Sequence, residues 1–316
     1  MIQTGHSTYR VLKTLGRGTQ AKVKLCECAT TGQQYAAKFY DRQSLMKRRT
    51  SGRNGSSPLM DLHREITIMG RLCDGHIVQL FEVVDDPRQQ EIILFLEFLR
   101  GEVVLKGLTT NQLLSEREAR RVFVALARGL LVCHQAGVLH RDIKPENLLR
   151  AVPLSEELGD SSSSRRRSSS ERNGGGDTVQ PTIKLADFGV ASCFTPGQSD
   201  LVRDTVGTPA FHSPECFSSS SETGYSGIMA DVWAVGVSLF QMVFGRPPFM
   251  ASSMMETYRK ARDEPVDMSP QANHGVKISG ALAELLALLL HKDPSQRLRL
   301  EHALQHPWCQ QTARGS

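Results

Sequence analysis

The sequence lacks the features that would indicate a membrane span or an oxidising compartment. The polar segment Met1–Arg10 shows no signal-peptide pattern. The richest apolar stretch, Ala281–Leu290, contains Glu284 and is too short to span a bilayer, so we expect a buried helix there and no membrane partner. The 7 cysteines are an odd number without paired spacing, which predicts reduced thiols and a location in the cytoplasm, with the nucleus as an alternative.

Excess positive charge is also small. The net charge is +5, and the runs Lys47–Arg49 and Arg165–Arg167 supply more than that excess. Both runs lie in low-complexity surroundings, so we expect solvated loops there and no nucleic-acid partner. The remaining composition, 40% apolar and 22% charged over 316 residues, is typical of a globular protein. A chain of this length can bury a large core and usually divides into lobes.

Two motifs carry most of the chemical information. The segment His140–Asn147 reads His-Arg-Asp-Ile-Lys-Pro-Glu-Asn, and Asp187–Gly189 reads Asp-Phe-Gly. Phosphoryl transfer requires a positioned hydroxyl, magnesium to neutralise phosphate charge, and a clamp on the nucleotide. The order of residues in the two motifs resembles the order that protein kinases use. This resemblance makes Asp142, Lys144 and Asn147 the candidate catalytic residues. Magnesium prefers oxygen ligands, which makes Asn147 and Asp187 the candidate metal ligands.

A glycine-rich segment near the start of the chain is a candidate phosphate-binding loop. Glycines at 16 and 18 would let the backbone approach phosphate oxygens that a Cβ atom would crowd. Plain turn glycines are the alternative when this segment is considered alone. The candidate nucleotide-binding residues here are Leu15, Gly16, Arg17, Gly18, Thr19, Gln20, Ala21, Lys22 and Val23.

A lysine inside an apolar strand is the candidate phosphate clamp. Lys38 follows Gly18 by twenty positions and precedes Glu65, which lies in a helical pattern. Leu62, Ile66 and Met69 are spaced three or four apart and mark the packed face beside Glu65. Glu65 is therefore the expected partner of Lys38, whereas the rival Glu82 lies in a strand-like run. A solvated lysine at a strand edge is the alternative.

The buried strand Glu91–Leu99 runs into a connector, where Glu97–Leu99 should form a hinge whose backbone meets adenine. The other candidate nucleotide-binding residues are Ala36, Leu96, Glu97, Leu99 and Leu149, with Leu96 at the back of the pocket.

The sequence predicts an α+β fold with two lobes and a ligand cleft between them. Residues 1–99 form a small strand-rich lobe with one key helix, Pro58–Leu72, and residues 100–316 form a larger, mainly helical lobe. Two insertions interrupt the pattern. The first is Arg42–Ser57, and the second is 152–181, whose serine-, arginine- and glycine-rich composition predicts disorder.

Downstream residues are expected to support this arrangement. Asp231 begins an apolar helix, where a carboxylate can simply cap the helix. The resemblance to protein kinases implies instead that Asp231 braces the backbone of the 140–147 loop. Arg297 should pair with Glu215 in the interior, and Phe188 should pack against His140.

Together these motifs resemble the eukaryotic protein kinase family from Tyr9 to Trp308. The resemblance implies that ATP and Mg²⁺ are the cofactors and that Asp142 accepts the substrate's proton. It also implies that Lys144 stabilises the moving phosphoryl group, and that Lys144 with Pro145 selects serine and threonine substrates in proteins. Arg141 would pair with a phosphate on the activation segment, which begins at Asp187 and ends at Glu215, with Thr205 the preferred acceptor and Ser199 the runner-up. Thr208 would hydrogen-bond near Asp142 instead.

Three segments are more similar to the calcium/calmodulin-dependent protein kinase kinases: Phe81–Pro87, Thr205–Phe211 and Phe244–Met250. This resemblance implies an upstream kinase whose partners are other kinases, phosphorylated on activation-loop threonines. The chain departs from that family at Glu146, where a small residue is more usual. It also shows no basic amphipathic segment after Trp308, so calmodulin is not an expected partner. The alternatives are a general basophilic kinase of the calmodulin-kinase group and a pseudokinase scaffold.

Overall fold

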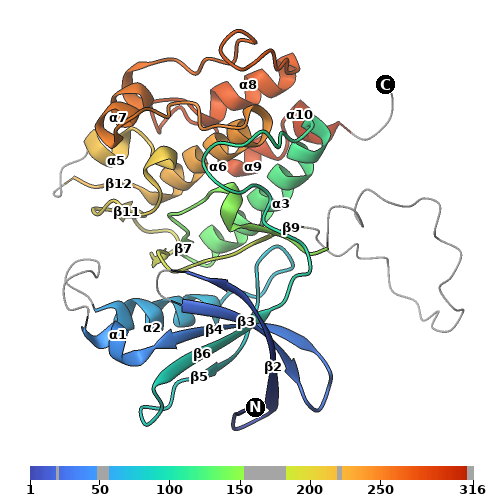
Figure 1. Cartoon of the computed structure of the whole chain (residues 1–316). Helices are drawn as coiled ribbons and strands as arrows, with labels where there is room; N and C mark the ends of the chain where they lie inside the picture. Colours follow the sequence, from blue (N-terminus) through green and yellow to red (C-terminus); the bar gives the residue numbers. More distant parts are fainter. Residues whose placement is uncertain (19–20, 48–56, 153–182, 219–222, 312–316) are drawn as a thin grey trace, which may run out of the picture.

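The computed structural model describes residues 1–18, 21–47, 57–152, 183–218 and 223–311. Several sequence predictions lie outside these residues: Thr19 and Gln20 of the glycine-rich segment, the middle of the first insertion, and nearly all of the second. Within the described parts, a strand-rich half is followed by a helical half (Figure 1). The expected bilobal α+β kinase fold is confirmed.

The first half is built on one antiparallel six-stranded sheet with the order β1-β2-β3-β4-β6-β5. Tyr9 stacks on Phe95 across this sheet, with 3.9 Å between ring centroids. The strands are β1 (Ile2–Gln3), β2 (Thr8–Arg17), β3 (Ala21–Cys28), β4 (Gln34–Asp41), β5 (Leu80–Val84) and β6 (Glu91–Glu97).

Helix α2 (Pro58–Met69) carries Glu65 beside this sheet. The Ser57 side chain accepts from the backbone N–H of Met60, and proline occupies the first helical position, where its missing N–H costs nothing. The helix ends at Met69, with Gly70 as its C-cap, so the predicted end at Leu72 was three residues too far. The first insertion begins with a helix that the sequence did not suggest, α1 (Arg42–Lys47).

The second half packs helices around α6 (Gly227–Phe244), most of whose residues are buried. Within the described residues, α6 is the one helix long and apolar enough to cross a membrane, and 89% of it is buried inside the protein. The helix expected near Ala281–Leu290 is present as α8 (Gly280–Leu289), with its leucines in the core. The other helices are α3 (Glu116–Gln135), α5 (Glu215–Ser218), α7 (Met254–Asp263), α9 (Leu300–Ala303) and α10 (Pro307–Gln310).

Short strands and turns at the junction of the two halves carry the functional motifs. The 140–147 segment follows β7 (Val138–Leu139) and ends in the turn η2 (Pro145–Asn147), and Asp187 follows β9 (Ile183–Leu185). One continuous hydrophobic core joins α2 and β6 of the first half to α3, α6 and α8 of the second. The remaining short elements are β8 (Leu148–Arg150), β10 (Ser192–Cys193), β11 (Leu201–Val202), η3 (Pro209–Phe211) and β12 (Tyr225–Ser226).

Candidate active site

Lys38 lies between two carboxylates that come from distant parts of the chain. Its Nζ atom is 3.3 Å from Glu65 Oε1 on α2 and 3.7 Å from Asp187 Oδ1 after β9. Burial would lower the pKa of Lys38, but the charges of Glu65 and Asp187 outweigh it and raise the pKa above its usual value. The lysine is therefore a permanent cation. The rival Glu82 lies elsewhere and accepts a hydrogen bond from the Tyr9 hydroxyl at 2.7 Å.

Asp142 is held by three neighbours. Its carboxylate is 2.8 Å from Lys144 Nζ and accepts from the Thr208 hydroxyl at 2.8 Å. The Asn147 amide donates to the Asp142 carbonyl at 2.7 Å and to its carboxylate at 3.1 Å. Burial would raise the pKa of Asp142, but the hydrogen bond and charge of Lys144, with the Thr208 contact, lower it below its usual value. Asp142 is therefore ionised, and the expected position of Thr208 beside it is confirmed.

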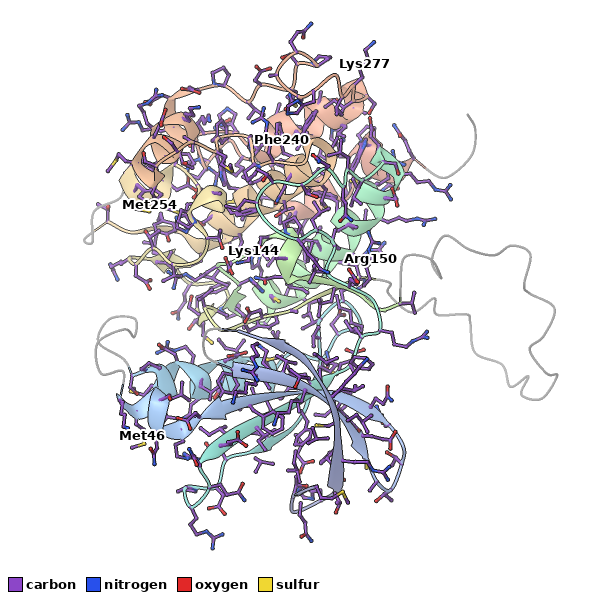
Figure 2. The ribbon with its side chains drawn as sticks, viewed as in Figure 1. Met46, Lys144, Arg150, Phe240, Met254 and Lys277 are labelled. Atoms are coloured by element: carbon purple, nitrogen blue, oxygen red, sulfur yellow. The ribbon has the colours of Figure 1, made fainter. Side chains whose placement is uncertain are left out.

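Lys144 lies where the two halves of the molecule meet (Figure 2). Its Nζ atom also donates to the Thr208 hydroxyl at 2.8 Å, so one ammonium contacts both the 140–147 segment and the segment after Gly207. The ammonium, the Asp142 carboxylate and the Thr208 hydroxyl thus form one hydrogen-bonded group.

The expected brace at Asp231 is confirmed. Its carboxylate accepts from the backbone N–H of His140 at 3.0 Å and of Arg141 at 2.8 Å, and it contacts His134 Nε2 at 3.0 Å. The cap of α6 is a different residue, Ser226, whose side chain accepts from the N–H of Met229. Burial would raise the pKa of Asp231, but His134 and the other contacts lower it, so the buried carboxylate stays charged.

Two residues of this region adopt left-handed backbone conformations that side chains other than glycine seldom take. Arg141 has φ 67° and Asp187 has φ 66°. Such strain persists only where the surroundings fix it, and it concentrates at functional sites. His140 and Phe188, which neighbour the two strained residues, pack edge to face at 4.9 Å between ring centroids, as predicted. The predicted interior ion pair between Arg297 and Glu215 is also present, at 2.6 Å.

A cleft of about 340 Å³ opens between these groups. Its walls bring together the glycine-rich segment, the lysine clamp, and both key aspartates. The lining residues that the sequence predicted are Gly18, Ala21, Val23, Lys38, Glu65, Asp142 and Asp187. Sequence reasoning missed Tyr40, Gly189 and Val190. The strand period of two could have found Tyr40, because it shares a face of β4 with Lys38.

The predicted adenine contacts lie where the two halves share their core. Leu96 is buried in that core, and Ala36, Leu99 and Leu149 pack against it. The Glu97 side chain points to an ion pair with Lys184 on β9, at 2.7 Å, which the sequence did not reveal. Leu15 and Gly16 lie in β2, while Arg17 and Lys22 line a neighbouring pocket with Asp41 and Ile93.

The residues present fit a magnesium–nucleotide complex. The Asp187 side chain is 54% exposed. Asn147 contacts Asp142 through its side-chain nitrogen, and this contact does not involve the side-chain oxygen of Asn147. Among the described residues, no group of three or more His, Cys, Asp or Glu side chains could hold a metal ion. Magnesium usually keeps several waters and binds through one or two protein oxygens plus substrate phosphates, and Asp187 and Asn147 could supply such oxygens.

The comparisons with known proteins agree with this geometry. The protein kinase domain family matches residues 9–309. The serine/threonine-protein kinase GRIK2 of Arabidopsis thaliana is 34% identical over 95% of this chain and 64% of its own length. A calcium/calmodulin-dependent protein kinase kinase of Caenorhabditis elegans is 30% identical over 95% of this chain and 52% of its own. SNF1-activating kinase 1 of Saccharomyces cerevisiae is 31% identical over 96% of this chain.

This chain spans 64% of the length of GRIK2 and 28% of the length of SNF1-activating kinase 1. The family match nevertheless covers nearly the whole chain. The chain therefore belongs to the protein kinase domain family, and relatives that it matches are named as serine/threonine-protein kinases.

Proposed function

We propose that this chain transfers the γ-phosphoryl group of ATP to serine and threonine hydroxyls of proteins. When bound, ATP with magnesium supplies the phosphoryl group and the cation that offsets phosphate charge. Lys38, oriented by Glu65, would hold the α- and β-phosphates. Asn147 and Asp187 would offer oxygens to the metal. The hinge and its apolar neighbours would hold adenine.

The observation that carries this proposal is the state of Asp142. Lys144 and Thr208 keep its carboxylate ionised at the edge of the cleft, so it can orient a substrate hydroxyl and accept its proton late in the transfer. Lys144, 2.8 Å from Asp142, is placed to neutralise charge on the group being transferred. These contacts come from the chain itself, so the site is assembled before substrate arrives.

A pseudokinase scaffold has less support. Lys38, Glu65, Asp142, Asn147 and Asp187 are all present, and the structure gathers them at one cleft or its border. The scaffold alternative predicts a thermal shift with Mg²⁺ and nucleotide but no phosphate incorporation into any protein. Incorporation that depends on the Asp142 carboxylate would exclude it.

We further propose that the substrates are other kinases, phosphorylated on activation-loop threonines. Support comes from the three segments that resemble calmodulin-kinase kinases and from two relatives, one named as a protein kinase kinase and the other as an SNF1-activating kinase. A folded kinase domain as substrate would offer binding energy at its surface, away from the reacting hydroxyl.

Glu146 favours a second candidate, a general kinase for basic peptides. Its carboxylate accepts from the Gly107 backbone N–H at 2.9 Å, which fixes a negative charge within the 140–147 segment. A fixed carboxylate near the peptide path would attract an arginine or lysine of the substrate.

Paired substrates separate the two candidates. An intact, unphosphorylated kinase domain and a short arginine-containing peptide would be compared by kcat/KM, with the same domain lacking its activation-loop threonine as control. We expect about tenfold or greater preference for the intact domain, from binding energy at the remote surface. Equal or better use of the peptide would favour the basophilic kinase.

A further inference from the structure

Arg141, which precedes the candidate base Asp142, points its guanidinium into the activation segment. The side chain is 7% exposed, and Nη2 lies 2.7 Å from the Asp204 carboxylate and 2.6 Å from the Asp204 carbonyl oxygen. Its backbone N–H donates to Asp231, so one residue contacts both α6 and the activation segment. A buried guanidinium requires an anion beside it, and the Asp204 carboxylate, which is part of the chain itself, supplies that anion.

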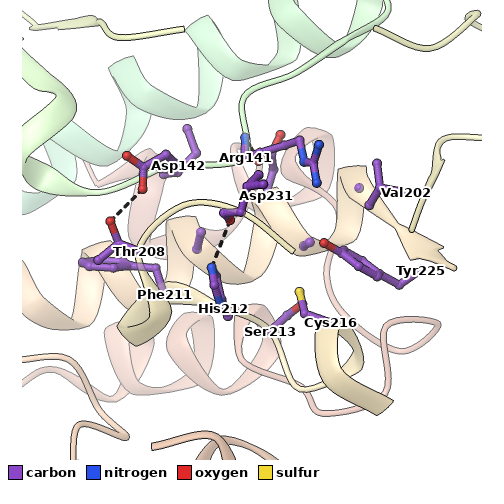
Figure 3. A pocket seen from close by; sticks show the side chains of 15 residues that line it. Arg141, Asp142, Val202, Thr208, Phe211, His212, Ser213, Cys216, Tyr225 and Asp231 are labelled. Carbon is purple, nitrogen blue, oxygen red and sulfur yellow. Dashed lines mark hydrogen bonds between the residues drawn. The ribbon is translucent and has the colours of Figure 1, made fainter. Parts of the chain in front are cut away.

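The segment around Asp204 is anchored on both sides. The Tyr225 hydroxyl donates to the Asp204 carbonyl at 2.9 Å, and Val202 pairs with Tyr225 between β11 and β12. Before it, the Asp200 carboxylate accepts from the Ser226 hydroxyl and from the N–H of Ile228 at the start of α6. Figure 3 shows Arg141, Val202 and Tyr225 in the lining of a pocket next to this segment. These contacts use only unmodified side chains and backbone groups, so they hold the segment without a phosphate.

The neighbouring Thr205, the phosphate acceptor expected from the sequence, is engaged differently. Its hydroxyl donates to the Cys216 carbonyl at 3.0 Å, and the guanidinium it was expected to engage already contacts Asp204. A phosphate on Thr205 would break that hydrogen bond and place about two further negative charges next to the Asp204 carboxylate.

We propose that the Asp204 carboxylate takes the place of an activating phosphate as the partner of Arg141. It is a positioning residue: its carboxylate fixes Arg141, Arg141 fixes the backbone of the 140–147 segment, and that segment holds Asp142. The activation segment then reaches its working geometry without phosphorylation. This inference rests on the proposed kinase function and concerns how that same site is regulated.

The rival arrangement uses a second, neighbouring pocket. Arg64 of α2 and Arg203 line it together with Arg141 and Asp204, so a phosphate bridging these arginines would also link α2 to the activation segment. The two arrangements differ in a measurable way, because only the rival requires a phosphate for activity.

The experiment compares phosphatase-treated protein, with removal of phosphate verified by intact mass, to untreated protein. Variants of the full chain are Asp204→Asn, Asp204→Glu and Thr205→Val, with Asp263→Asn on exposed α7 as the matched carboxylate control. We expect treated wild type, Thr205→Val and Asp263→Asn to stay within about threefold of untreated wild type, since none loses the Arg141 contact. Asp204→Asn should lose about 10- to 100-fold in kcat with little change in KM for ATP, a range typical of coupling between sites. Asp204→Glu should recover part of that loss.

The phosphatase comparison requires no variant, so it decides the matter even if Asp204→Asn fails to fold. Loss of activity on phosphatase treatment would overturn the inference, as would Asp204→Asn turning over like wild type. In both cases the untreated wild type remains an active kinase, and the proposed function stands. A wild type inactive before and after treatment would overturn the proposed function and this inference with it.

Discussion

The glycine-rich segment and the region around the 140–147 loop use glycine for opposite reasons. A Cβ atom added at Gly16 would meet nothing within 4 Å, and one at Gly18 would meet only the Ala21 carbonyl, at 3.7 Å. At Gly207 the backbone has φ 96°, and a Cβ would lie 2.4 Å from the Arg141 carbonyl oxygen. The protein's own packing thus demands glycine at 207 but leaves it unexplained at 16 and 18.

This difference separates the part of the site that is built by the chain from the part that is shaped by the ligand. Around Asp142 the contacts are complete among the protein's own side chains. At the glycine-rich segment, the absence of a Cβ atom at Gly16 and Gly18 would instead let phosphate oxygens approach the backbone closely. Each prediction below tests one side of this comparison.

The largest effect is expected at Asp142. Replacement by Asn keeps the shape but removes the charge that accepts the substrate's proton, and kcat should fall about 10²- to 10⁴-fold. KM for ATP and the melting temperature should stay near those of wild type. Steady-state phosphate incorporation measures both parameters, and near wild-type turnover would refute the assigned role.

Asp231 should matter for stability as well as turnover. In Asp231→Ala the buried N–H groups of His140 and Arg141 lose their acceptor, and the free energy of unfolding should drop by about 3–5 kcal/mol. Urea denaturation measures this loss. Asp263→Ala, at an exposed end of α7, is the control and should leave the urea midpoint unchanged. A brace that could be removed without loss would mean that the loop is held in some other way.

Gly207→Ala tests the part of the site that is built by the chain's own packing. The substitution forces a side chain into a left-handed conformation against the Arg141 carbonyl, which should cost about 1–3 kcal/mol of stability. It should also displace Thr208 from Asp142 and so reduce kcat. Unchanged stability in the same urea assay would show that the close approach is not a real constraint.

Gly16→Ala tests the part of the site that is shaped by the ligand. There is room for the methyl group in the free protein, so stability should not change. KM for ATP should rise about tenfold, equivalent to about 1.4 kcal/mol, because the methyl group would crowd the phosphates. A loss of stability equal to that of Gly207→Ala would remove the distinction between the two regions.

The smallest effect is expected on the acid side of the pH profile. The folded pKa of Asp142 lies below its unfolded value, so its stabilising contribution is present above the unfolded value, near pH 3.9, and is lost only as pH falls through the folded pKa. Between about pH 5.5 and 8, kcat should therefore show no titration of this group. An acidic limb in that range that disappears in Asp142→Asn would contradict the depressed pKa.

The contacts predicted correctly from the sequence rest on regular structure and on the resemblance to protein kinases. Helical spacing selected Glu65 as the partner of Lys38, and the resemblance implied that Asp231 braces the loop. The partner of Arg141 could not be found in this way. Asp204 and Thr205 are adjacent in an irregular segment, where no period tells which side chain faces the guanidinium. The Glu97–Lys184 pair was missed because strand pairing across a long insertion sets it.

The most direct test of the account is backbone hydrogen exchange with and without Mg²⁺ and a non-hydrolysable ATP analogue. The account predicts slower exchange on binding in the peptide covering residues 15–23, and little change in residues 140–147, which are already held by Asp231 and Asn147. Protection confined to 140–147, with 15–23 unchanged at saturating analogue, would contradict it.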